Sequence, residues 1–369
     1  MVNIKELLIA FLKKEPYSRL RPVAKYGIHE LLRALNWAAA SEILNAFYEL
    51  GLDKTLKTPK STMEVALEHS IEDTIFLHEF LRALVKMRIL DEAAGRFKLK
   101  IFIGKLKKPS TVDVLQKTPM RAIFEVIRLT GDNIIDVLMT GKRELKWLTD
   151  AAIAFEPLEF SPQLVMLRLK TLEILYKGVK ERLKISGVED PVILTIGLAS
   201  GFGLVNVAQF FQKIRGKIIA LDPSEREVRL AEGLLEDFGL NEVVNVDIFD
   251  ISKSLHKSAI VSEFLKNRDG FDAVISIERW RFYDSVMRSQ ILANIAFHMA
   301  LYGSLVDFDF VKEQILFLNT VLYTIEGWRG FLAMNEKREM FSLVFQKIKE
   351  RAGKMIIRAD LPLVKGIWL

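Results

Sequence analysis

The 369-residue sequence contains no cysteine and only five histidines. The absence of cysteine excludes disulfide bonds, thiolate zinc sites and a cysteine nucleophile, and it favours a cytoplasmic location. Four of the histidines are scattered along the chain without the spacing of metal ligands, so we expect no metal site. These four are His29, His69, His78 and His256.

Long uncharged apolar runs are also missing. No stretch reaches the roughly 18 apolar residues that suggest a membrane-spanning helix, so we expect no membrane partner. Residues 1–21 carry charges on both sides of a short apolar run and have no small-residue cleavage site, which predicts an amphipathic helix rather than a signal peptide. The net charge of +6 is mild for this length and does not by itself indicate nucleic-acid binding.

Hydrophobic residues make up 50% of the chain and charged residues 27%, the balance of a folded protein with a sizeable core. The length predicts about two or three domains. We expect an N-terminal domain over residues 1–110, a helical connector over 111–188 and a sheet domain over 189–369.

The N-terminal part shows helical spacing at 28–50, 61–68 and 71–87, followed by two short β runs around Gly95. Three helices and a hairpin predict a winged helix. The third helix begins with Glu72 and Asp73, which disfavours contact with DNA phosphates. We therefore favour dimerisation through the N-terminal helices, or a lid, over DNA binding, although the hairpin carries the basic residues Arg96, Lys98 and Lys100.

The second half alternates apolar runs with helical stretches. Strands are expected near 192–196, 217–221, 243–246, 271–277 and 303–310, and helices at 204–213, 224–238 and 289–301. Further helices are expected at 314–327 and 336–352, and closing strands at 355–359 and 365–369. Such alternation predicts a mostly parallel sheet that helices cover on both faces.

The strongest functional signal lies in residues 191–223. An apolar run leads into a turn with Gly197, Gly201 and Gly203, then into a helix, and the next apolar run ends at Asp222. Glycines allow a ligand to approach the backbone, and a helix N-terminus offers free N–H groups. An acid about 20 residues after such a turn can accept hydrogen bonds from a ribose. The pattern fits a dinucleotide or S-adenosylmethionine, with a ligand-free tight turn as the plain alternative.

This layout resembles the class I S-adenosylmethionine-dependent methyltransferases, and most of all the small-molecule O-methyltransferases with a winged-helix dimerisation domain. The motifs at residues 195–201, 218–225 and 244–250 carry the resemblance. It implies a Rossmann-like α/β sheet domain, a winged-helix α-helical N-terminal domain, a homodimer and a small-molecule acceptor for O- or N-methylation. The cofactor-binding residues that it implies are Gly197, Ala199, Gly201, Asp222, Asp247 and Ile248.

Three departures from that family pattern affect the expected chemistry. Thr195 stands where the family has an acid, and Ala199 replaces the middle glycine. Arg281 falls about where the family places a catalytic histidine, and an arginine cannot act as a base near neutral pH. Glu278, Tyr283 and Asp284 are nearby, and His298 lies on an apolar helix as a packed residue, so the catalytic residue stays unassigned.

Three alternatives remain: a degenerate scaffold, a DNA-binding regulator and a dehydrogenase. An enzyme requires an open pocket that reaches Asp222, Asp247 and the glycine turn. A scaffold predicts that side chains such as Leu198 or Phe202 fill that pocket. The glycine spacing of four and two residues does not match the G-x-G-x-x-G of a dehydrogenase.

Overall fold

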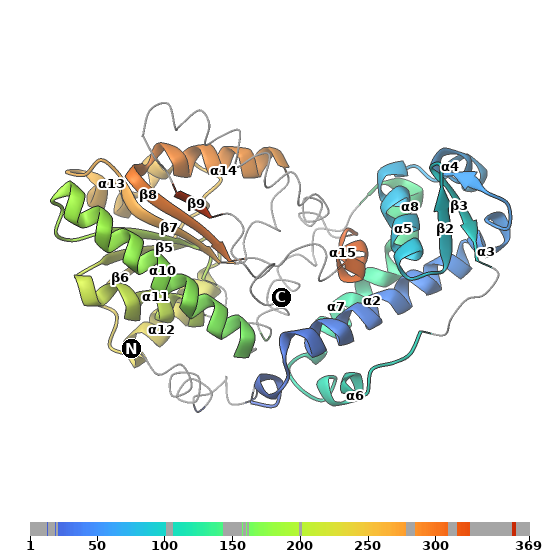
Figure 1. The fold of residues 1–369 in the computed structure, drawn as a ribbon, viewed down its shortest axis with the longest axis horizontal. Helices are drawn as coiled ribbons and strands as arrows, with labels where there is room; N and C mark the ends of the chain where they lie inside the picture. Colours follow the sequence, from blue (N-terminus) through green and yellow to red (C-terminus); the bar gives the residue numbers. More distant parts are fainter. Residues whose placement is uncertain are drawn as a thin grey trace. The chain divides into compact units, whose positions relative to one another are not determined.

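A computed structural model of the chain describes residues 13, 19, 21–100, 106–142, 157, 160, 162–198, 201–277, 285–308, 316–324 and 356–358. The chain forms two compact units (Figure 1). The segments 21–100, 106–142 and 316–324 belong to one, which we call the helical unit. The segments 162–198, 201–277, 285–308 and 356–358 belong to the other, the sheet unit.

The sheet unit is built on six parallel strands in the order β6-β5-β4-β7-β8-β9. Every residue of β4 is buried, because helices cover both faces of the sheet and the strand is apolar throughout except for Thr195. Six of the seven strands that the sequence predicts for this part of the chain are present, and the seventh, at 365–369, lies outside the described residues. The six are β4 Val192–Ile196, β5 Lys217–Asp222, β6 Val244–Ile248, β7 Phe271–Ile277, β8 Met299–Phe308 and β9 Ile356–Arg358.

Helices cover both faces of this sheet, as the alternating pattern predicts. One layer contains α10 (Pro162–Ser186), α11 (Phe202–Phe211) and α12 (Glu225–Asp237), which contact one another in that order. The other layer contains α13 (Ala259–Leu265) and α14 (Ser285–Phe297), whose Val261, Ile291 and Ile295 pack with Leu194 and Val274 of the sheet. Helix α13, which has only seven residues, is not among the predicted helices.

A buried ion pair fixes the amino end of the sheet. Asp272 of β7 pairs with Arg182 of α10, and its Oδ2 accepts the Val192 N–H at 2.7 Å. Asp272 and Arg182 are both buried. One carboxylate therefore joins a helix to the two central strands, although β4 and β7 are far apart in the sequence.

The predicted junction between the helix at 289–301 and the strand at 303–310 is wrong in detail. The helix ends at Phe297, and β8 begins at Met299 because the His298 carbonyl accepts the Phe271 N–H at 2.8 Å. An irregularity follows, in which Phe271 pairs with Met299 but Ala273 pairs with Ser304. A Cβ at Gly303 would lie 2.9 Å from the Phe271 and Ala300 carbonyl oxygens, so the irregularity requires glycine.

The helical unit contains the predicted helices and hairpin. Ser61 caps α4 in a capping box with Glu64, and Ala94 and Gly95 form the hairpin turn with positive φ. The elements are η2 Val23–Lys25, α2 Ile28–Glu49, α3 Leu52–Thr55, β1 Lys60–Ser61, α4 Thr62–His69, α5 Thr74–Lys86, β2 Leu90–Ala93, β3 Arg96–Leu99, α6 Thr111–Leu115, α7 Arg121–Asp132 and α8 Ile134–Thr140. The three strands form an antiparallel sheet in the order β1-β3-β2.

A late segment of the chain completes the helical unit. Helix α15 (Leu316–Leu322) contacts α2 and α7, and Tyr323 stacks on Phe76 with ring centroids 4.5 Å apart. The Thr324 hydroxyl donates to the Thr130 carbonyl at 3.1 Å. The sheet domain expected over 189–369 includes this segment, whereas its contacts are with the helical unit.

The grouping of the elements also differs from the predicted division at residues 110 and 188. Helices α6, α7 and α8 of the predicted connector belong to the helical unit, whereas α10 belongs to the sheet unit. The predicted helix at 336–352 and strand at 365–369 lie outside the described residues.

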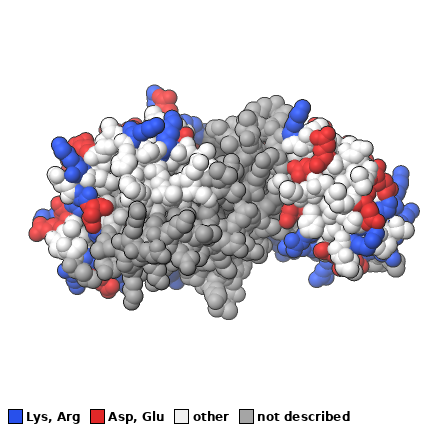
Figure 2. Space-filling model, turned by 90° about the horizontal axis from the view of Figure 1, so that it is seen from above, with Lys and Arg blue, Asp and Glu red and all other residues white. Residues whose placement is uncertain are grey.

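Surface charge is mixed on the described parts of both units. Figure 2 shows lysine and arginine side chains interspersed with aspartate and glutamate on the face in view. Among the described helices, none combines the length and the apolar character needed to cross a membrane. Within the same residues, no group of three or more histidine or acidic side chains is arranged to hold a metal ion.

Candidate functional site

The carboxyl end of β4 forms the turn that the sequence singles out. Gly197 has a φ of 81° and donates its N–H to the Leu221 carbonyl at 3.0 Å, which ties the turn to β5. Gly201 has a φ of 76° and is the N-cap residue of α11. Ala199, the third predicted residue of this turn, lies outside the described residues.

Packing against α12 and the backbone conformation both favour glycine at position 201. A Cβ at this position would lie 2.7 Å from Leu234 Cδ1 and 3.4 Å from Ala231 Cα, both on α12. The positive φ adds a second reason, since L-residues rarely adopt it. The glycine therefore lets α11 begin against α12, whatever ligand the turn binds.

Asp222 ends β5 directly beside this turn, as the sequence predicts. Its side chain is fully buried. Oδ2 accepts the Leu198 N–H at 3.0 Å, and Oδ1 accepts the Ser224 N–H at 2.8 Å. The carboxylate thus joins the turn after β4 to the turn after β5, using hydrogen bonds of the strong charge-assisted kind.

The next strand along brings Asp247 and Ile248 to the same edge. Asp247 pairs in register with Leu221, and Ile248 with Asp222. Asp247 is half-buried and accepts a long hydrogen bond of 3.5 Å from the Ser258 hydroxyl, while Ile248 is 50% exposed. A carboxylate and an apolar surface are therefore open to a ligand at the end of β6.

Two buried hydroxyls lie near the carboxyl ends of the central strands. Thr195 on β4 and Ser276 on β7 are fully buried, and neither hydroxyl has a hydrogen-bond partner among the described residues. Such groups are uncommon, because an unpaired buried polar atom costs about 1–3 kcal/mol. Ser276 is not among the predicted site residues. The signal that could have indicated it is a polar residue near the carboxyl end of a mostly apolar strand.

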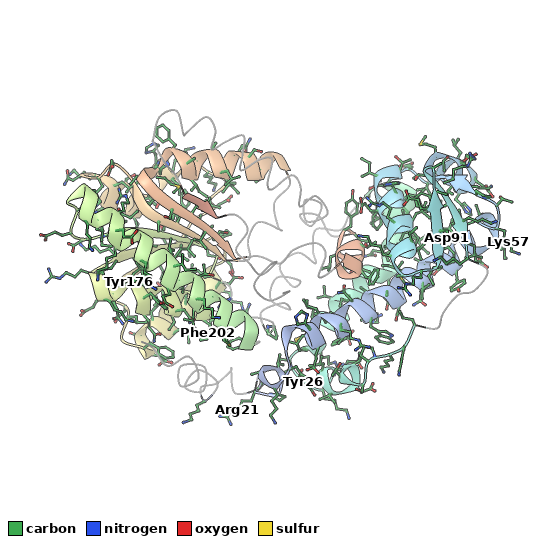
Figure 3. The ribbon with its side chains drawn as sticks, viewed as in Figure 1. Arg21, Tyr26, Lys57, Asp91, Tyr176 and Phe202 are labelled. Carbon is green, nitrogen blue, oxygen red and sulfur yellow. The ribbon has the colours of Figure 1, made fainter. Side chains whose placement is uncertain are left out.

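The side chains proposed as pocket fillers in the scaffold hypothesis are buried. Leu198 and Phe202 are both fully buried, and Phe202 opens α11 (Figure 3). The pocket described below, at the edge of β6, does not include the Gly197–Gly203 turn in its lining. Among the described residues, Asp222, Leu198 and Phe202 are buried, whereas Asp247 and Ile248 at the end of β6 are half-buried and exposed.

Of the residues that the sequence analysis considers for proton transfer, the structure describes only His298. Glu278, Arg281, Tyr283 and Asp284 lie outside the described residues. His298 is a packed residue, as predicted. It lies at the amino end of β8, with Nδ1 2.7 Å from the Asn294 carbonyl oxygen and its ring 4.3 Å from that of His256. Burial lowers the pKa of His298.

The basic residues of the hairpin are largely neutralised. Arg96 donates to both carboxylate oxygens of Glu64, and Lys100 pairs with Asp91 at 3.0 Å. Backbone and side-chain hydrogen bonds from Ser61, with Arg96, lower the pKa of Glu64 to about 2. Only Lys98 of the three lacks a described ion pair, so the hairpin presents little free positive charge.

Comparison with known proteins identifies the fold. No family model matches the sequence, and no curated protein matches it either. The structure is similar to that of the CurJ carbon methyltransferase, with a TM-score of 0.56 and 13% identity over 95% of this chain and 89% of the other. It is also similar to the DszA carbon methyltransferase, with a TM-score of 0.51 and 14% identity over 93% and 86% of the two chains. The predicted Rossmann-like α/β fold of the methyltransferases is confirmed.

Proposed function

We propose that this protein is an S-adenosylmethionine-dependent methyltransferase that acts on a small molecule. One observation carries the proposal: on a methyltransferase fold, the glycine turn, Asp222 and Asp247 meet at the carboxyl edge of neighbouring parallel strands. Ligands of open α/β sheets bind at this edge, where the strand order reverses between β4 and β7.

The residues at this edge fit the adenosyl half of the cofactor in part. Ile248 offers an exposed apolar surface for the adenine, and Asp247 an accessible acceptor beside it. The hydroxyls of Thr195 and Ser276 are buried polar atoms without described partners. Asp222 has the right position for the ribose hydroxyls, but its carboxylate is enclosed, so ribose contact requires the Leu198 turn to move.

In this proposal Gly197, Ala199 and Gly201 form the turn that approaches the cofactor, and Asp222, Asp247 and Ile248 hold its adenosine. The cofactor, when bound, supplies an electrophilic methyl group. The chain's own task is to hold an acceptor in line with that methyl group and to exclude water, which accounts for much of such an acceleration. Oxygen, nitrogen and carbon acceptors remain open, and both structures above are described as carbon methyltransferases.

The proposal also includes a role for the helical unit. Three helices, a short strand and a hairpin are the parts of a winged helix, and we propose homodimerisation through the N-terminal helices in the cytoplasm. The pairing of Arg96 with Glu64 and of Lys100 with Asp91 supports this role over DNA binding. Replacing Trp37 or Leu44 by a charged residue is expected to yield monomers, and a dimer that persists excludes that interface.

A second candidate is a degenerate methyltransferase-like scaffold. The burial of Asp222, Leu198 and Phe202 favours it, because an open cofactor site exposes at least part of this turn. Thr195, in place of the family's acid, favours it as well.

A methyl-transfer assay separates the two candidates. The purified protein is incubated with methyl-labelled S-adenosylmethionine and a panel of phenols, amines and compounds with acidic C–H groups, and S-adenosylhomocysteine is measured. The enzyme proposal predicts acceptor-dependent formation of S-adenosylhomocysteine that Asp247→Ala reduces. If the folded protein binds the cofactor but methylates none of the acceptors, the result favours the scaffold.

A further inference from the structure

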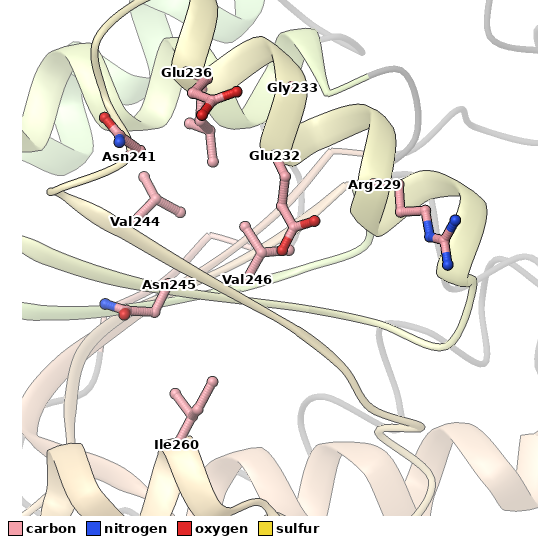
Figure 4. A pocket seen from close by; sticks show the side chains of 10 residues that line it. Arg229, Glu232, Gly233, Glu236, Asn241, Val244, Asn245, Val246 and Ile260 are labelled. Atoms are coloured by element: carbon pink, nitrogen blue, oxygen red, sulfur yellow. The ribbon is translucent and has the colours of Figure 1, made fainter.

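The edge strand β6 lies at the bottom of a groove of about 640 Å³. Figure 4 shows α12 above the strand and Ile260 of α13 below it. Glu232 and Glu236 line the groove from α12, and Val244, Asn245 and Val246 line it from the strand. The groove therefore follows the outer side of the sheet, at a different place from the glycine turn.

The backbone of β6 presents unpaired groups to this groove. The Val243 carbonyl accepts the Ile218 N–H of β5 at 3.0 Å, and the Phe249 N–H donates to the Asp222 carbonyl at 3.0 Å. In a parallel ladder alternate residues bond to the same neighbour, so Val244 and Val246 direct their N–H and C=O groups away from β5. No described strand pairs with that side of β6.

The groove is acidic. Glu232 and Glu236 are exposed, and neither has an ion-pair partner among the described residues. Arg229, the one cation among the described lining residues, pairs with Glu225. The α12 wall therefore has uncompensated negative charge directly beside the open strand edge.

The spacing of these carboxylates matches an added strand. Glu232 and Glu236 are one helical turn apart, about 6 Å. Side chains on one face of a strand are about 6.6 Å apart. The opposite wall offers Ile260 and Asn245, a more apolar surface. An added strand thus meets acid on one face and an apolar side chain on the other.

We propose that the edge of β6 binds an extended peptide segment that alternates basic and apolar residues, by adding it as a strand to the sheet. Backbone pairing along Val244 and Val246 supplies the hydrogen bonds, and the basic side chains face Glu232 and Glu236. A second copy of this chain is a poorer occupant, because twofold pairing through β6 brings two sets of these carboxylates together. The proposal is independent of the methyltransferase function.

The test uses the full-length protein and a fluorescently labelled peptide that alternates lysine and valine, with binding followed by anisotropy at low ionic strength. The double variant E232K/E236K is expected to weaken binding about tenfold or more. A peptide that alternates glutamate and valine is expected to bind this variant better than the wild type. E181K/E263K is the control, because it changes the net charge equally on exposed residues outside the groove lining.

Backbone pairing is tested with two peptides N-methylated at alternate residues. Only the peptide whose methyl groups face β6 is expected to lose affinity, since the other keeps its N–H groups toward the strand. The proposal is overturned if the unmodified peptide does not bind, if both methylated peptides bind equally, or if E181K/E263K weakens binding as much as E232K/E236K.

Discussion

Asp222 and Asp247 stand at the carboxyl ends of adjacent strands, yet their surroundings differ. Asp222 is fully buried and accepts two backbone N–H groups, from Leu198 and Ser224. Asp247 is half-buried and has one long hydrogen bond from Ser258. Leu198, directly after β4, donates its N–H to Asp222, whereas β6 has no outer neighbour among the described strands. Position on the sheet thus makes one carboxylate a structural connector and leaves the other accessible.

Replacing Asp222 has the largest expected effect. Asp222→Ala leaves two backbone N–H groups without their carboxylate, and we expect unfolding free energy to fall by about 3 kcal/mol. Asp222→Asn keeps one acceptor oxygen and is expected to lose about half as much. Urea unfolding measures both, and a loss below about 1 kcal/mol for Asp222→Ala contradicts the connector role.

Gly201→Ala tests the turn that encloses Asp222. The positive φ and the 2.7 Å approach to Leu234 Cδ1 together predict a loss of about 2 kcal/mol. Gly239→Ala is the matched control, because Gly239 has a φ of 64° with nothing within 4 Å of the added Cβ. Equal losses in the two variants would show that packing against α12 contributes nothing.

We expect Asp247→Ala to affect ligand affinity and to leave stability nearly unchanged, whereas Asp222→Ala is expected to lower stability. We expect stability to change by no more than about 0.5 kcal/mol, because the carboxylate has one long hydrogen bond. Affinity for S-adenosylhomocysteine is expected to fall about tenfold, from the loss of one hydrogen bond to a charged acceptor. Urea denaturation measures the change in stability, and calorimetry on the same preparation measures the change in affinity. A stability loss as large as that of Asp222→Ala would contradict the difference proposed between the two carboxylates.

Replacing His298 has the smallest expected effect on stability. Because His298 lies at the other end of the sheet, this variant also serves as a control. Its lowered pKa means that the unfolded chain takes up a proton near pH 6.5 before the folded protein does. Stability should therefore fall as the pH drops below about 6.5, and His298→Asn should weaken this dependence. Affinity for S-adenosylhomocysteine at pH 7 should not change in this variant, since His298 lies at the amino end of β8, away from the proposed cofactor edge.

The strands and the acids at their ends could be predicted from the sequence, because buried parallel strands form continuous apolar runs. The start of β8 could not, since its irregular pairing depends on a hydrogen bond from Phe271, some 27 residues earlier. The position of α15 also depends on residues far away in the sequence, because Tyr323, directly after the helix, stacks on Phe76. The sequence placed Asp222 beside the turn but did not show that Leu198 and Ser224 enclose it, because that depends on the path of two turns in space.

Calorimetric titration with S-adenosylmethionine and S-adenosylhomocysteine tests the central claim, that the carboxyl edge of β4, β5 and β6 is a cofactor site. The account predicts micromolar binding by the wild type, weaker binding by Asp247→Ala and none by Asp222→Ala. The absence of heat with a folded, ligand-free wild-type protein would contradict the enzyme proposal and leave the scaffold.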